Sequence, residues 1–178
     1  KNAFSQVAWS VFIAKDCAYE KTIPYFEKDL DNNRLSTQWQ INYAKALAVC
    51  GQLNKSEVVI EKVYRKNPFL KNGYAQCGFT SQFIFNHNPL EAIKWFDKDI
   101  KLNRLHGQNY INYASILAYL GNIDKALKIV EEIYESAPSC VNGYSTVGWY
   151  YYAVKNRDPE KALELFEKDE VLSRIQPN

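Results

Sequence analysis

The residues with the clearest chemical potential are carboxylate and guanidinium groups that recur together along the chain. In each set an arginine follows an aspartate by five positions, and the sets are 70 residues apart: Asp29 with Arg34, Asp99 with Arg104, and Asp169 with Arg174. An aspartate acts as a general acid or base only beside a substrate or a second reacting group, and no His or Ser recurs at one position in all three sets. We therefore interpret each set as a structural tie between a helix end and the turn that follows it.

Other side chains that could carry chemistry are scattered. No two of the four cysteines lie close enough for a CxxC metal or redox motif. His87 and His106 lie near turn sequences without partners at ligand spacing, and neither a glycine-rich phosphate loop nor a GxSxG sequence occurs. The sequence therefore predicts no catalytic residue, no metal site and no cofactor, and we expect that this segment is not an enzyme.

Composition narrows the class of protein. The 178 residues are 47% hydrophobic and 24% charged, and 22 Lys and Arg balance 20 Asp and Glu. Such a balance gives no reason to expect a nucleic-acid partner, and the longest apolar stretch, 147–154, is too short to span a membrane. Unpaired cysteines weakly favour a reducing, cytoplasmic location, although a periplasmic one stays open. Because the chain starts at Lys1 and has no Met, we expect it to be part of a longer polypeptide.

An internal repeat of 70 residues organises the chain. The segment 25–30 matches 95–100 and then 165–169, 41–44 matches 111–114, and 72–74 matches 142–144, all without gaps. Sequence similarity at a constant period is the signature of a repeat protein, in which each unit buries its apolar face against its neighbours.

Each 70-residue unit divides into two helix pairs. Between residues 108 and 138, apolar residues recur at helical spacing, first from Tyr110 to Leu117 and then from Ala126 to Tyr134. Gly121 separates the first helical pattern from the second, and Pro138 ends the second. The pattern predicts a helix, a short turn and a second helix within 34 residues, and the other half of the unit repeats it in 36.

This pattern resembles the tetratricopeptide repeat (TPR) family. The matching positions in one repeat are Tyr110, Tyr113, Ala114, Leu117, Gly121, Ala126, Val130 and Pro138. The resemblance covers nearly the whole chain, although Ser56 and Thr22 stand where the family usually has Ala. It implies an all-α, right-handed superhelical solenoid of antiparallel helix pairs. We expect a single solenoid over 1–178 with five repeats, at 1–36, 37–70, 71–106, 107–140 and 141–176.

The resemblance also implies a concave groove lined by the first helix of each pair. The register places these residues in a peptide-binding groove: Gln6, Trp9, Asn42, Lys45, Gln76, Phe79, Asn112, Tyr119, Trp149 and Tyr152. The same register would place Gln82 there. The recurring amides resemble the asparagine ladder of O-linked N-acetylglucosamine transferases, since one amide can pair with one peptide unit. Thr146 interrupts that ladder, and amides are also common on any solvated helix face. The aromatic residues are expected either to contact a partner's apolar side chains, to stack on sugar rings, or to fill the space between helices.

Two functions follow from the resemblance. The first is a protein–protein interaction module or scaffold that binds a peptide or protein segment in the groove. The second is the substrate-recognition region of a larger enzyme such as a glycosyltransferase. A clamp for a carboxy-terminal peptide is disfavoured because only Lys45 supplies a cation on the groove face. We also expect apolar ends without capping helices, which favour self-association or further repeats in the parent protein.

Overall fold

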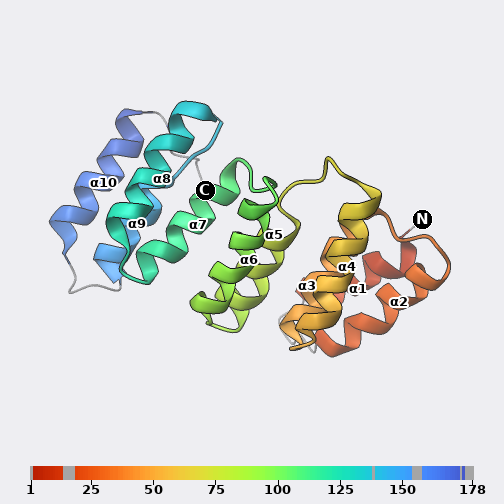
Figure 1. Cartoon of the computed structure of the whole chain (residues 1–178). Coiled ribbons are helices and arrows are strands. Elements are labelled where there is room, and N and C mark those ends of the chain that lie inside the picture. Colours follow the sequence, from red (N-terminus) through yellow and green to blue (C-terminus); the bar gives the residue numbers. More distant parts are fainter. Residues whose placement is uncertain (1, 14–18, 138, 154–157, 173, 175–178) are drawn as a thin grey trace. The chain divides into compact units, whose positions relative to one another are not determined.

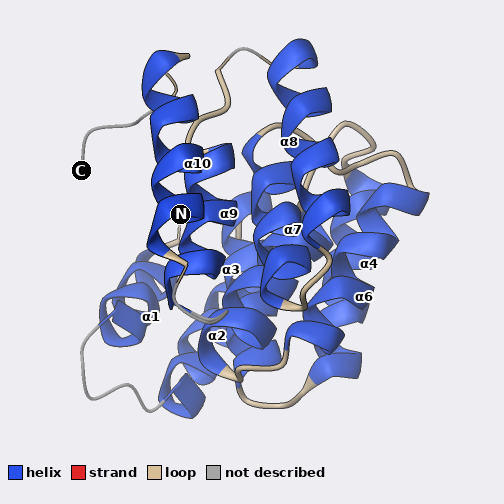
Figure 2. Cartoon of the chain, turned by 90° about the vertical axis from the view of Figure 1, so that its left-hand side faces the viewer, coloured by secondary structure: helices blue, strands red, loops and turns tan. Residues whose placement is uncertain are grey.

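The computed structural model describes residues 2–13, 19–137, 139–153, 158–172 and 174, and the side chains of 9, 11–13 and 19 lie outside the described part. The described residues form helices joined by turns, with no strand among them (Figure 2). The chain divides into two compact units, Lys1–Arg104 and Leu105–Asn178. No helix among the described residues is long and apolar enough to cross a bilayer.

The helices follow one another in pairs (Figure 1). The elements of the first unit are α1 (Ala3–Ile13), η1 (Tyr19–Thr22), α2 (Ile23–Asp31), α3 (Thr37–Val49), α4 (Leu53–Lys66), α5 (Gly73–Cys77), η2 (Gly78–Phe85) and α6 (Pro89–Lys101). Those of the second unit are α7 (Gln108–Tyr119), α8 (Ile123–Ser136), α9 (Gly143–Ala153) and α10 (Pro159–Val171). Within the units α1 packs on α2, α3 on α4, α5 with η2 on α6, α7 on α8, and α9 on α10. The predicted all-α architecture of helix pairs is confirmed, while the assembly of all five pairs into one solenoid stays a prediction.

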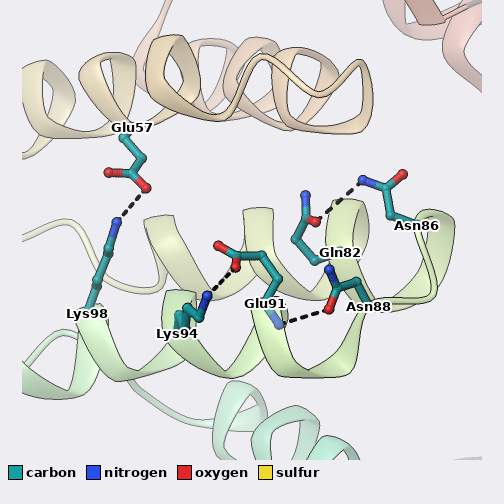
Figure 3. Close-up of polar contacts among 7 residues, drawn as sticks. All are labelled: Glu57, Gln82, Asn86, Asn88, Glu91, Lys94 and Lys98. Carbon is teal, nitrogen blue, oxygen red and sulfur yellow. Dashed lines mark hydrogen bonds and ion pairs between the residues drawn. The ribbon is translucent and has the colours of Figure 1, made fainter.

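Local sequence explains where the helices begin and end. Asn88 caps α6 by accepting a hydrogen bond from the backbone N–H of Glu91 at 3.1 Å, and Pro89 follows it at the first helical position (Figure 3). Asp158 caps α10 in the same way. Asn103 follows α6 with φ of +54°, a left-handed conformation that asparagine tolerates better than most residues.

Small residues allow the paired helices to approach closely. A Cβ atom added to Gly78 would lie 2.6 Å from Cβ of Trp95, which is fully buried on α6. Such a distance is far inside van der Waals contact, so only glycine fits there without a shift. The second helix of this pair, α6, is also joined to α4 by the ion pair between Lys98 and Glu57, at 2.5 Å (Figure 3).

The first helix of the third pair departs from the predicted α-helix. From Gly78 to Phe85 the backbone is a π-helix, and the N–H of Asn86 donates to the carbonyl of Ser81, five residues earlier, at 2.9 Å. The Ser81 hydroxyl donates to the Cys77 carbonyl at 2.6 Å, which satisfies a backbone oxygen in the wider helix. The expectation that Gln82 faces the groove is wrong: its side chain is buried, and its amide donates to the Ser81 hydroxyl at 3.1 Å.

Candidate functional site

The second unit exposes large aromatic side chains on its first helices. Trp149 and Tyr152 on α9 are 58% and 53% exposed, and Tyr119 on α7 is 47% exposed. The Trp149 ring lies 5.4 Å from that of Tyr152 and 6.2 Å from that of Phe166 on α10, in edge-on geometry. Phe166 thus supports the Trp149 ring from the neighbouring helix. We call Trp149 and Tyr152 the α9 aromatic pair, and their exposed faces are suited to apolar or planar groups of a ligand.

Three amides of the predicted ladder are half-buried, and their side chains have no partner among the described residues. The side chains of Asn42 on α3, Gln76 on α5 and Asn112 on α7 make no hydrogen bond within the described part of the chain. Asn42 and Gln76 lie on helices that pack against each other. A free amide offers one donor group and one acceptor, which is what a peptide backbone needs. Gln6 on α1 is exposed, and Thr146 occupies the corresponding position on α9.

The other aromatic positions of the predicted groove differ from Trp149. Phe79, on η2, is half-buried and its ring lies 5.6 Å from that of Phe83 on the same helix. The side chain of Trp9 lies outside the described residues. At this position of the repeat, the second unit therefore has the well-exposed indole of Trp149, and the first unit has the partly covered ring of Phe79.

Lys45 is a half-buried cation on α3, three residues after Asn42. Burial lowers the pKa of its ammonium group, and no carboxylate in the described part of the chain forms an ion pair with it. Burial also raises the pKa of the Cys77 thiol, to about 12, so Cys77 is neutral at physiological pH and does not balance the charge of Lys45. An anionic ligand group near Lys45 would offset the cost of burying this charge.

The recurring aspartates hold successive repeats together. Asp99 is fully buried, and its Oδ1 accepts a hydrogen bond from the Tyr64 hydroxyl at 2.5 Å while its Oδ2 accepts one from the Ala75 N–H at 2.8 Å. The Tyr64 oxygen in turn accepts from the N–H of Gly73 at 2.6 Å. Asp99 on α6 thereby joins the start of α5 to the end of α4, which belongs to the preceding repeat.

The second unit repeats this arrangement. Asp169 accepts from the Tyr134 hydroxyl at 2.5 Å and from the Ser145 N–H at 2.7 Å, and Gly143 donates to the Tyr134 oxygen at 2.6 Å. We call this arrangement the tyrosine–aspartate contact. All of the carboxylate oxygens involved have donors, which favours the predicted structural role over an acid–base role.

The guanidinium groups of Arg104 and Arg174 lie over tyrosine rings, while the backbone N–H of each arginine joins the turn to the carbonyl of the aspartate at the helix end. Arg104 lies over the Tyr64 ring at 4.0 Å and donates to the Leu70 carbonyl at 3.1 Å. Only the backbone N–H of Arg104 reaches Asp99, at its carbonyl oxygen, 2.7 Å away. The physical reason is burial: the carboxylate points into the interface between repeats, whereas the guanidinium group keeps access to solvent over the tyrosine ring.

The tyrosine–aspartate contacts predict a loss of stability in alkali. Burial and the adjacent carboxylate raise the pKa of Tyr64, and burial and a hydrogen bond to Asp169 raise that of Tyr134, both from a usual value of 10.0. Above about pH 10 the unfolded chain loses these protons and the folded chain keeps them, so the free energy of unfolding falls as pH rises, by up to about 1.4 kcal/mol per unit per tyrosine. Urea unfolding between about pH 8 and pH 11 measures this slope. The Tyr64→Phe/Tyr134→Phe variant should show a shallower slope, and an unchanged slope would contradict the assignment.

Two surface pockets accompany the tyrosine–aspartate contacts. The first, about 300 Å³, is lined by Glu61, Tyr64, Arg65, Tyr74, Leu102 and Arg104. The second, about 240 Å³, is lined by Glu131, Tyr134, Glu135, Tyr144, Leu172 and Arg174. Each residue of the second pocket lies 70 positions after its equivalent, and the one change of charge is from Arg65 to Glu135. The 70-residue repeat relates the two sets of residues in the sequence, but only the folded chain shows that each set lines a pocket.

Comparison with solved structures identifies the fold. The chain matches a crystal structure of YrrB, described as a TPR protein with an unusual peptide-binding site, with a TM-score of 0.52 and 18% identity over 94% of this chain and 82% of that one. The chain has the TPR fold. It also matches MamA, with a TM-score of 0.50 and 21% identity over 86% of this chain and 91% of that chain, and a second MamA structure at 0.50 and 18% over the full length of both. The sequence matches no family model and no curated protein.

The TPR fold explains why Ser56 is tolerated where the family usually has Ala. Ser56 is fully buried on α4, and its hydroxyl donates to the Ala44 carbonyl of α3 at 2.7 Å. The polar atom is therefore satisfied across the helix pair, and burying it costs little. Ala44 keeps the small side chain that the close packing of a TPR helix pair requires.

Proposed function

We propose that this chain is a protein-interaction module that binds an extended peptide or a segment of a partner protein along its first helices. The observation that carries the proposal is the α9 aromatic pair, because two large aromatic side chains stand more than half exposed on one helix. Exposed aromatic residues supported by packing are typical anchors of protein interfaces. The peptide-binding site described for YrrB supports the same type of function for a TPR fold.

The free amides add backbone recognition to this proposal. Asn112, on the helix that packs against α9, pairs with a peptide unit of the ligand, and the aromatic pair takes an apolar or aromatic side chain of the ligand. In the first unit, Asn42 and Gln76 act in the same way, and Lys45 favours a ligand carboxylate. These residues define the peptide-binding groove that we propose within each unit. The same contacts would serve the substrate-recognition region of a larger enzyme.

Removal of one aromatic anchor should weaken peptide binding without unfolding the chain. We expect Trp149→Ala to raise the dissociation constant of a bound peptide about tenfold or more, because the side chain is exposed and its loss removes interface contacts. Peptides would be selected from a random library displayed on phage against the whole chain. Their affinities for the wild type and the variant would then be measured by calorimetry.

Phe69→Ala is the matched control, because Phe69 is also an exposed aromatic residue but lies in the turn after α4. It should leave affinity within about twofold. Asn112→Ala should weaken binding of the same peptides even when their side chains vary, since the amide contacts the backbone. Equal affinities of the wild type, Trp149→Ala and Asn112→Ala for every selected peptide would refute the groove.

A further inference from the structure

The first repeat contains a buried carboxylate oxygen without a hydrogen-bond donor. Asp29 on α2 is fully buried, and its Oδ2 accepts from the N–H and the hydroxyl of Ser5 at 2.7 and 2.6 Å. Its Oδ1 has no partner in the described part of the chain. An unpaired buried oxygen of a carboxylate is costly, so this atom calls for a donor from outside the described residues.

The two equivalent aspartates show what that donor is. Oδ1 of Asp99 and of Asp169 each accepts from a tyrosine hydroxyl located 35 residues earlier, on the second helix of the preceding repeat. The position 35 residues before Asp29 lies outside the 178 residues of the sequence. The structure therefore presents the acceptor half of a tyrosine–aspartate contact.

The carboxylate of Asp29 is itself buried, but two residues of the same repeat lack contacts that their equivalents make. Val7 on α1 is 48% exposed, whereas its equivalents Cys77 and Val147 are fully buried. The side chain of Arg34 is exposed and makes no hydrogen bond or ion pair in the described part of the chain, whereas the guanidinium group of the equivalent Arg104 lies over a tyrosine ring. The apolar contact, the carboxylate and the guanidinium group all lack the partner that a preceding repeat supplies elsewhere.

We propose that the exposed face of α1 and α2 is the docking surface for a further helix-turn-helix repeat that carries a tyrosine, whose hydroxyl donates to Asp29 Oδ1. The docking repeat is of the type of residues 37–70 and 107–140, which carry Tyr64 and Tyr134. Its tyrosine ring packs under Arg34, and its apolar face covers Val7. This interface is independent of the proposed peptide-binding groove.

Ala3 refines the geometry of the docked tyrosine. The equivalent residues are Gly73 and Gly143, where an added Cβ would lie 2.8 Å from the Tyr64 oxygen and 2.9 Å from the Tyr134 oxygen. The methyl group of Ala3 therefore shifts the incoming phenol outward, which is tolerable because the crowded atoms are at the end of a side chain. Replacing Ala3 by glycine should strengthen the docking.

The test joins a copy of residues 37–70 directly before Lys1 of the whole chain. Because residue 71 is equivalent to residue 1, the copied tyrosine lies 35 residues before Asp29, as Tyr64 lies before Asp99. The reporter is hydrogen exchange of the Ser5 N–H, which donates to Asp29. We expect exchange to be about tenfold to hundredfold slower with tyrosine than with phenylalanine at the copied position, as a hydrogen bond to a charged group predicts.

Variants of the acceptor separate this contact from general stabilisation. Asp29→Asn should remove most of the difference between the tyrosine and phenylalanine copies, and Ala3→Gly should increase it. The helical content of each extended chain, measured by circular dichroism, shows that the copy is folded. Equal Ser5 exchange with the tyrosine and phenylalanine copies would overturn the proposal.

A second copied repeat and the oligomeric state complete the test. A copy of residues 107–140, with Tyr134 in the same register, should reproduce the effect, and failure of both copies to dock would also overturn the proposal. Sedimentation of the 178-residue chain tests a second copy as the occupant. A dimer that Val7→Asp dissociates would assign this face to self-association and would equally overturn the tyrosine assignment.

Discussion

Replacing Asp99 by alanine is expected to lower the free energy of unfolding by about 3–5 kcal/mol. The change leaves the Tyr64 hydroxyl and the Ala75 N–H buried without their acceptor, and it opens a space where a fully buried side chain stood. Because Asp99 joins two repeats, the loss should appear as weaker coupling between the helix pair of 37–70 and that of 71–106. Urea unfolding followed by circular dichroism measures the free energy, and hydrogen exchange of the Ala75 N–H locates the loss.

The control for this prediction is Asp31→Ala. Asp31 is exposed at the end of α2, so its removal should change the free energy of unfolding by about 0.5 kcal/mol or less. Asp99→Ala should leave the peptide affinity of the folded chain unchanged. An unaltered melting temperature together with lost peptide binding would reverse the structural interpretation of the aspartates.

Replacing Gly78 by alanine is expected to cost about 3 kcal/mol of stability. The new Cβ would meet the Cβ of Trp95 at 2.6 Å and the Ala92 carbonyl oxygen at 3.1 Å, and neither atom can move without shifting α6. The modest gain in helix propensity from glycine to alanine does not offset this overlap. Thermal and urea unfolding of the variant measure the loss.

The equivalent glycine of the second unit supplies the comparison. A Cβ on Gly148 would lie 3.0 Å from Cε1 of Phe166, at the end of a side chain that can rotate, and 3.1 Å from the Ala162 carbonyl oxygen. The Cβ of Leu165, which is equivalent to Trp95, would be 3.3 Å away, so Gly148→Ala should cost only about 1 kcal/mol. Equal effects at the two glycines would contradict the steric argument, because of these two positions only Gly78 has a 2.6 Å overlap with a buried side chain.

Much of the architecture follows from local sequence. The pattern from Tyr110 to Leu117, the glycine at 121 and the proline at 138 predicted the pair α7 and α8, and the structure has these helices at Gln108–Tyr119 and Ile123–Ser136. Helical hydrogen bonds join residues four apart, and a helix face is set by a period of 3.6 residues, so a short window of sequence contains both signals. The 70-residue repeat extended the same inference along the chain and led to the TPR fold.

For the candidate groove, the sequence predicted only which residues share one face of the first helices. Helical spacing placed Asn42, Asn112 and Trp149 on first helices, but it could not show that the amides lack protein partners or that Trp149 is more exposed than Phe79. Exposure depends on which side chains of the neighbouring helices reach the same point. The π-helix of Gly78–Phe85 likewise escaped prediction, because it changes the hydrogen-bond register without any change in the apolar pattern and so turns Gln82 inward.

The donors of the tyrosine–aspartate contacts could not be predicted from the sequence. The recurrence of the aspartates was visible, and a structural role was predicted for each Asp–Arg set, but the sequence did not indicate which groups donate to the carboxylates. The true donors are Tyr64 and Tyr134, each 35 residues earlier. Nothing local marks a pair at that separation, because the contact exists only after two helix pairs have packed. The helices and their order therefore follow from the sequence alone, whereas the buried polar partners, and the unfilled one at Asp29, depend on how neighbouring repeats bring distant residues together.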